Sequence, residues 1–264
     1  AEKRGKAVGS IDETGAVLGV DVGFSGARRT TCFCVLSWDA RNASIAFQTT
    51  GSTAAARSAA IAELTAGRHL SAVALDGPLT RGLVRVRHYR VAEAILSRGI
   101  LQRRGKPGQT NSPTGQKLHQ HATGLAGQVL AGTSVAAATH WQSIHPLRIV
   151  EAFPNSFLAA LVPERDIPAL KRDASDRYWE VLVDRSDKLQ QLIHSLLPGR
   201  KLSFDLKYRT NHEERAGVVC ALTALCVSAG QHVAVGDAID GDIMLPHQSA
   251  WGGDAASNGT WLEP

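Results

Sequence analysis

Three short apolar runs of this 264-residue chain each carry an acidic residue near their carboxyl end, and this feature most limits the folds open to the chain. Short runs rich in β-branched residues that stop at Gly or Pro are typical of buried strands. In open α/β sheets, sites lie outside the carboxyl ends of the strands, so these acids are the first candidates for a site. The predicted strands are 16–23, 71–75 and 146–153, and their acids are Asp21, Asp76 and Glu151.

The remaining sequence predicts further strands and several helices. Segments 30–38 and 43–49, with a turn at Arg41 and Asn42, favour a β-hairpin. Helices are predicted at 52–66, 83–98, 116–138, 155–161, 173–197 (one long or broken helix) and 211–229, and a last strand at 233–238. This order indicates an α/β fold in which helices flank a mixed β-sheet. We expect one domain over 1–264, with a core at about 17–251, a polar N-terminal lead and a Gly-rich C-terminal tail.

The composition excludes several classes of protein. Hydrophobic residues make up 44% and charged residues 20% of the chain, which is typical of a globular protein and not of a disordered one. No run approaches the roughly 18 apolar residues of a membrane span, and segment 1–15 lacks the apolar region of a signal peptide. The four cysteines form no C-x-x-C pair, so we interpret them as small buried residues of a reducing compartment. The expected location is therefore cytoplasmic.

The acids are more informative together than singly. Alone, each has an ordinary role, because Asp is common in turns and an acid in the first turn of a helix complements its dipole. Carboxylates gathered at one sheet edge would repel one another unless a cation lay among them, and hard oxygen ligands suit Mg²⁺ or Mn²⁺. Two such ions, about 4 Å apart, can activate a water and stabilise the leaving oxygen of a phosphodiester. The acids therefore suggest metal-dependent hydrolysis.

Six segments of the chain, which span about residues 17–251, resemble the DUF429 family. They are GVDVGFSGAR (19–28), ALDGPL (74–79), R-x-x-E from Arg90 to Glu93, VEAFPNSFL (150–158), NHEERAGVVCALTAL (211–225) and VGDAIDGDIMLP (235–246). Members of this family are regarded as predicted nucleases of the ribonuclease-H-like superfamily. The resemblance implies that Asp21 is the central metal ligand at the end of the first strand. It also matches Asp76 to the acid that closes the fourth strand, and Glu151 to the acid of an E-x-x-P segment, which could instead orient a helix.

The chain departs from the family at a fourth acidic position. The resemblance implies an Asp on the late helix, directly before an apolar run, but Ala216 occupies that place. Glu213 lies one helical turn earlier, so it is expected on the same side of the helix and could substitute as a catalytic and metal-binding residue. Equally, the change could mean that nuclease chemistry is weakened or lost, which would leave a non-catalytic binding module.

Basic residues suggest a partner for the acids. The formal net charge of +5 is compatible with a polyanion such as nucleic acid, although many other proteins share it. Arg28, Arg81, Arg90 and Lys207 follow or approach the predicted strand ends and are candidates for substrate binding. Each also has an ordinary interpretation as a solvated charge, and Arg90 could simply pair with Glu93, three residues later on a helix.

A second class of function fits the first strand. Asp21-Val22-Gly23-Phe24-Ser25 has the D-x-G-x-S form found in actin and sugar-kinase relatives, where backbone N–H groups of such a turn hold nucleotide phosphates. Those proteins duplicate the fold, for which 264 residues is short, and no second Gly-rich phosphate loop is evident. Serine-hydrolase and P-loop motifs are absent. The sequence gives no oligomeric state.

Overall fold

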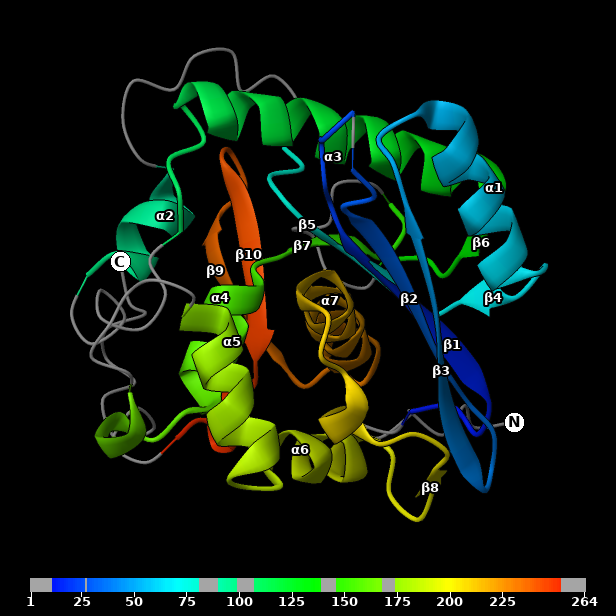
Figure 1. Ribbon diagram of the computed structural model, residues 1–264, viewed down its shortest axis with the longest axis vertical. Helices are drawn as coiled ribbons and strands as arrows, with labels where there is room; N and C mark the ends of the chain where they lie inside the picture. Colours follow the sequence, from blue (N-terminus) through cyan, green and yellow to red (C-terminus); the bar gives the residue numbers. More distant parts are fainter. Residues whose placement is uncertain are drawn as a thin grey trace, which may run out of the picture.

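The chain forms a large mixed β-sheet with helices on both faces (Figure 1), in a computed structural model that describes residues 11–26, 28–80, 90–98, 107–138, 146–167 and 174–252. This confirms the α/β fold with a mixed, helix-flanked sheet. The eight strands lie in the order β8-β3-β2-β1-β5-β7-β10-β9. Their bounds are β1 Gly15–Asp21, β2 Thr31–Trp38, β3 Asn42–Thr50, β5 Ala72–Asp76, β7 Ile149–Ala152, β8 Lys201–Leu202, β9 His232–Asp237 and β10 Gly241–Pro246. A separate two-stranded sheet pairs β4 (His69–Leu70) with β6 (Ser134–Val135).

Strand direction brings the acids to one edge of the sheet. β1, β2 and β3 form an antiparallel meander, which confirms the predicted hairpin, whereas β1, β5, β7 and β10 run parallel. Val20 pairs with Leu75 and Leu75 pairs with Glu151, so the last residues of β1 and β5 are neighbours. Asp21 and Asp76 therefore leave adjacent parallel strands at the same edge.

Two cores form because side chains of a strand alternate between faces. Val17 of β1 packs under one layer of helices, while Leu18 and Val20 pack under the other. One layer holds α1 and α3, seen together at the top of Figure 1, and the other holds α4, α5, α6 and α7. The helices are α1 Ala54–Thr65, α2 Val91–Leu96, α3 Pro113–Gly132, α4 Pro154–Leu161, α5 Ala174–Trp179, α6 Lys188–Leu196 and α7 His212–Ser228.

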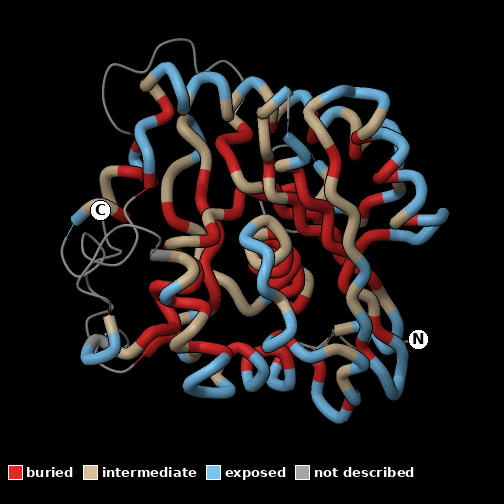
Figure 2. Tube along the Cα trace, in the orientation of Figure 1, coloured by how far each residue is buried: buried red, intermediate tan, exposed pale blue. Residues whose placement is uncertain are grey.

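Helix α7 is largely buried in the sheet's second layer, and most of its length is red in Figure 2. A glycine allows this close packing. A Cβ placed on Gly19 of β1 would lie 2.0 Å from the backbone nitrogen of Ala221, so only glycine lets the helix backbone rest directly on the strand. This contact fixes the position of the first turn of α7 relative to the end of β1.

Several predicted boundaries differ from the structure. The helix predicted at 173–197 as long or broken is broken in its described part, where α5 continues into the π-helical turn Glu180–Asp184 and α6 follows. Helix α3 begins at Pro113 after a Ser112 cap, and residues that were predicted as its last turn form β6 instead. Sequence reasoning missed β10, because its glycine start and proline end resemble a loop, yet it pairs with both β7 and β9. Of the helix predicted at 83–98, the described part is α2.

Two expectations from composition can be compared with the structure. All four cysteines are buried, as predicted, and none of them is part of a disulfide. Among the described residues, no helix is long and apolar enough to cross a membrane.

Candidate functional site

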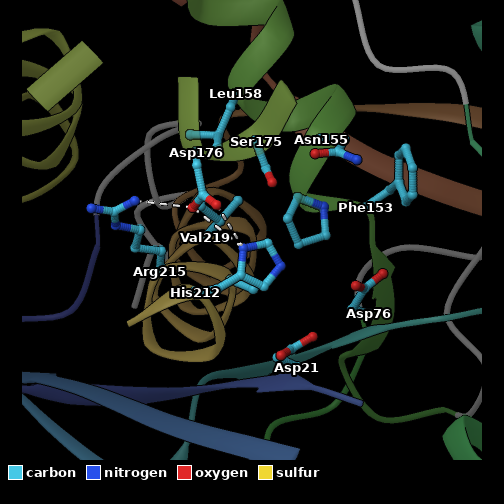
Figure 3. Close-up of a pocket in the computed structure, with 12 residues that line it drawn as sticks. Asp21, Asp76, Phe153, Asn155, Leu158, Ser175, Asp176, His212, Arg215 and Val219 are labelled. Atoms are coloured by element: carbon cyan, nitrogen blue, oxygen red, sulfur yellow. Dashed lines mark hydrogen bonds and ion pairs between the residues drawn. The ribbon is translucent and has the colours of Figure 1, made fainter. Parts of the chain in front are cut away.

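Asp21 and Asp76 line one pocket of about 90 Å³, at the edge of the sheet where β1 and β5 end (Figure 3). The opposite wall comes from the first turns of α4 and α7 and from α5. Its polar side chains are Asn155, Ser175, Asp176, His212 and Arg215. A space of this size has room for an ion and several waters. The strand-end rule thus placed the two aspartates correctly at a shared pocket.

Burial and mutual repulsion make the aspartate pair unfavourable when both carboxylates are charged. Burial raises the pKa of Asp21 well above its usual value, and the charges of Asp76 and Glu213 raise it further. Burial and the charge of Glu151 raise the pKa of Asp76 to about 7. A cation between the two carboxylates would reverse this balance, because an opposite charge favours the ionised form.

Glu151 lies beside this pair but faces a different partner. Its side chain is only 5% exposed, and both of its oxygens accept hydrogen bonds from Arg90: Nη2 donates to Oε1 at 2.7 Å and Nη1 to Oε2 at 2.9 Å. A bidentate contact of this kind is among the strongest that a carboxylate makes in a protein. Glu151 is therefore committed to an ion pair and does not line the pocket of Asp21 and Asp76.

Arg90, which the sequence suggested as a substrate-binding residue, is buried in a network of ion pairs and does not line the pocket of Asp21 and Asp76. Its side chain is 2% exposed, and it also donates to Glu93, to the Thr110 hydroxyl and to the backbone carbonyl of Asp240. Arg90 and Glu93 of the R-x-x-E segment thus form an ion pair with each other, which was the ordinary interpretation of Arg90. This network ties α2 to β7 and to the β9–β10 hairpin.

The face of α7 that meets the pocket differs from the one expected. His212, Arg215, Ala216 and Val219 line the pocket, in the i, i+3, i+4, i+7 pattern of one helical face. Glu213 lies off this face: its charge reaches Asp21, but its side chain is not part of the pocket wall. Ala216 is part of the wall, so the position where the family pattern has an acid does face the two aspartates.

Sequence reasoning missed a second polar group in the pocket, which Figure 3 shows opposite the aspartates. Asp176 of α5 accepts from Arg215 Nη1 at 3.0 Å and lies 3.2 Å from His212 Nδ1. Arg215 Nε is fixed by the backbone carbonyl of Arg209 at 2.7 Å. The spacing of His212 and Arg215 on one helix face was the available signal, whereas Asp176 lies 36 residues from His212 and no local pattern links them.

Two helix N-termini border the pocket, beside the carboxylate of Asp176. Pro154 and Asn155 stand in the first turn of α4, and His212 is the first residue of α7. N-terminal N–H groups and the helix dipole favour anions at such positions. Buried Oδ1 of Asn155 has no hydrogen-bond partner among the described residues. The pocket thus sets two carboxylates against two helix N-termini.

The other candidate residues lie elsewhere. Arg28 is exposed in the loop after β1, where its backbone N–H donates to Ser25 Oγ at 3.1 Å. Lys207 is exposed, and its Nζ lies 3.9 Å from Oδ1 of Asp187. Neither lines the pocket. Arg81 lies outside the described residues.

The described residues contain no group of three or more His, Cys, Asp or Glu side chains placed to hold a metal ion. No protein-family model, no curated protein and no solved structure matches this chain. The site must therefore be interpreted from its own geometry.

Proposed function

We propose that this chain is a metal-dependent phosphodiesterase or nuclease of ribonuclease-H-like fold, which hydrolyses a phosphodiester bound in the pocket of Asp21 and Asp76. The observation that carries the proposal is the meeting of two unlike walls, with paired carboxylates on the sheet side and the N-termini of α4 and α7 opposite. The carboxylates favour a cation and the helix N-termini favour an anion, so a phosphate bound to a divalent cation suits both walls. The positions of the two acids, at the ends of the first and fourth strands of the large sheet in chain order, agree with the resemblance to DUF429.

Asp21 and Asp76 fit a Mg²⁺ or Mn²⁺ ion. Mg²⁺ is often bound through one or two carboxylates, with waters and substrate phosphate oxygens completing its shell, so a third protein carboxylate is not required. When bound, such an ion supplies positive charge to the phosphate and lowers the pKa of a coordinated water. Because Glu151 is paired with Arg90 and Glu213 lies outside the pocket wall, we place the proposed ion on Asp21 and Asp76.

The opposite wall binds and orients the substrate. N–H groups at the starts of α4 and α7 donate to phosphate oxygens, and Asn155 offers a side-chain amide beside them. Asp176 accepts from His212 Nδ1, which leaves Nε2 free to accept or donate a proton on the pocket side (Figure 3). Arg215 keeps Asp176 in place. His212 is thus the group in this wall that can move a proton during hydrolysis.

Two alternatives share the same residues and are separated by the same assays. A nucleotide-binding protein would use the turn from Asp21 to Ser25, whose carbonyl at Gly23 is held by Arg57 Nη2 at 2.6 Å. A binding module that lost catalysis at Ala216 would bind a ligand without turnover. ATP binding without hydrolysis of a diester supports the first alternative, and metal-dependent ligand binding without any turnover supports the second.

The decisive experiment measures hydrolysis of bis(p-nitrophenyl) phosphate and of labelled single- and double-stranded DNA and RNA, with Mg²⁺ or Mn²⁺ and with chelator. We expect turnover that needs metal and is lost in Asp21→Asn and Asp76→Asn. Asp187→Asn makes the same chemical change at an acid 65% exposed and outside the pocket, so it should keep full activity. Metal-dependent turnover that survives Asp21→Asn would refute the proposal, as would a complete absence of turnover on all these substrates.

A further inference from the structure

The outer edge of β3 is open over most of its length. β8 pairs only with the first two residues of β3, Asn42 and Ala43, so within the part of the chain that the structure describes, residues 44–50 have no strand beside them on that side (Figure 1). The strand sequence, NASIAFQTT, contains no charged residue and no proline. Natural proteins usually protect a long exposed edge with charges, proline or a covering segment, because its free backbone groups pair readily with another chain.

The hydrogen bonds at the two ends of this edge show which residues face outward. At one end, the carbonyl of Ala43 accepts from the N–H of Ser203 at 2.9 Å. At the other, the carbonyl of Thr49 accepts from Arg29 Nε at 2.9 Å. Backbone groups of alternate residues point to the same side of a strand, so those of Ile45 and Phe47 point outward between them. Among the described residues, nothing bonds to the outward groups of Ile45 and Phe47.

A groove of about 750 Å³ runs along this edge. Three consecutive residues of β3, Ile45 to Phe47, line it, although their side chains alternate between faces, so the groove follows the backbone edge itself. Residues 202–209 form its second wall, which includes Phe204 and the 77% exposed ring of Tyr208. The site therefore offers backbone donors and acceptors next to an aromatic surface.

We propose that this groove, which we call the β3 groove, binds an extended peptide of a partner protein that adds a strand to the sheet. Peptides bind exposed edges in this way, with backbone hydrogen bonds for affinity and pockets for alternate side chains. The aromatic wall fits apolar side chains at every second position. Glu214 is paired with Arg209, and Lys207 with Asp187, whereas Asp205 has no ion pair among the described residues. The peptide therefore carries a Lys or Arg that reaches Asp205.

The two walls favour one inserted chain over a second copy of this protein. Self-pairing of β3 would bring a whole sheet against the edge, and residues 202–209 stand on the side from which it would approach. Nucleic acid fits less well, because the charges that line the groove are two acids and one arginine, and that arginine is already paired.

Panning a phage-displayed random heptapeptide library on the purified protein tests this inference. We expect enriched peptides with apolar residues at alternate positions and a basic residue. The best peptide, labelled with fluorescein, is then titrated with protein and followed by fluorescence anisotropy. Binding should also slow hydrogen exchange at the amides of Ile45 and Phe47.

Two variants remove different parts of the site. Ile45→Pro deletes one outward N–H, which edge strands tolerate, and Tyr208→Ala deletes an exposed ring without touching the core. Each should weaken binding about tenfold, the effect of roughly one lost hydrogen bond or aromatic contact. Ile239→Ala, at a side chain 82% exposed and outside the groove, should leave affinity unchanged. The inference is overturned if no peptide is enriched, if neither Ile45→Pro nor Tyr208→Ala weakens binding, or if sedimentation shows a dimer that Ile45→Pro dissociates.

Discussion

Replacing Asp76 with Asn should stabilise the metal-free protein at alkaline pH. The folded state raises the pKa of Asp76 from about 3.8 to about 7, chiefly through burial and secondly through the charge of Glu151. Between about pH 4 and pH 7, Asp76 of the folded protein therefore keeps a proton that the unfolded chain has already released. Stability from this group is complete below about pH 4 and is lost as the pH rises through about 7.

The magnitude follows from the size of the shift. One pKa unit corresponds to about 1.4 kcal/mol, so about three units set an upper bound of roughly 4 kcal/mol at pH 8. Partial exposure of the carboxylate and relaxation around it reduce the effect, and we expect Asp76→Asn to gain about 2–3 kcal/mol at pH 8. At pH 4 the wild-type side chain is itself neutral, so the difference between the two proteins should nearly vanish.

The assay is urea unfolding of both proteins in chelator, at intervals from pH 4 to pH 8, with the difference in unfolding free energy plotted against pH. Titrating groups far from Asp76 cancel in that difference, whereas Asp21 contributes to it because the charge of Asp76 raises the pKa of Asp21. Asp187→Asn serves as the matched control, because it makes the same chemical change at an exposed carboxylate outside the pocket. A difference that is zero or negative at pH 8, or that does not change with pH, would show that Asp76 is not held in an unfavourable charged state.

Three further predictions test the packing and the site. Gly19→Ala should destabilise the protein by about 2–3 kcal/mol or more in urea unfolding, because its new methyl group meets the α7 backbone, whereas Gly124→Ala on the exposed face of α3 should gain up to about 1 kcal/mol. Arg90→Met should cost about 3–5 kcal/mol and lower the melting temperature, because Glu93 and Glu151 lose their buried counter-charge; an unchanged melting temperature would contradict the network. Ala216→Asp adds a carboxylate to a pocket already lined by Asp21, Asp76 and Asp176, and it should tighten Mn²⁺ binding by about tenfold in calorimetry. Equal Mn²⁺ affinities would mean that this wall does not face the ion.

The sequence was most informative where the chemistry is local. Asp21 and Asp76 could be placed because a strand that ends at an acid shows both its direction and its burial in a few residues. It is harder to predict which face of a helix points into a pocket. Glu213 and Ala216 are three residues apart, but the face of α7 is set by its packing on Gly19, and that packing turns His212, Arg215 and Ala216 to the pocket and leaves Glu213 outside its wall.

Contacts between distant segments could not be predicted. Arg90 and Glu151 are 61 residues apart and Asp176 and Arg215 are 39 apart, and each pair meets only because separate helices pack against the same sheet. The Arg90 pair removed one expected metal ligand from the site. Asp176 also contacts Nδ1 of His212, and this contact adds to the site a histidine with a fixed ring orientation.

The two walls of the pocket together restrict the kind of ligand that it can bind. Paired aspartates disfavour an anion on its own, and the N-termini of α4 and α7, partly offset by the Asp176 carboxylate beside them, disfavour a cation on its own. A neutral ligand satisfies neither wall. A cation and an anion bound together satisfy both, with the cation against the sheet and the anion against the helices. Because each ion screens the other from the wall of like charge, their binding should be cooperative: Mn²⁺ should bind more tightly in the presence of inorganic phosphate, and phosphate more tightly in the presence of Mn²⁺, by the same factor. Independent binding of the two in calorimetry would refute this interpretation of the walls.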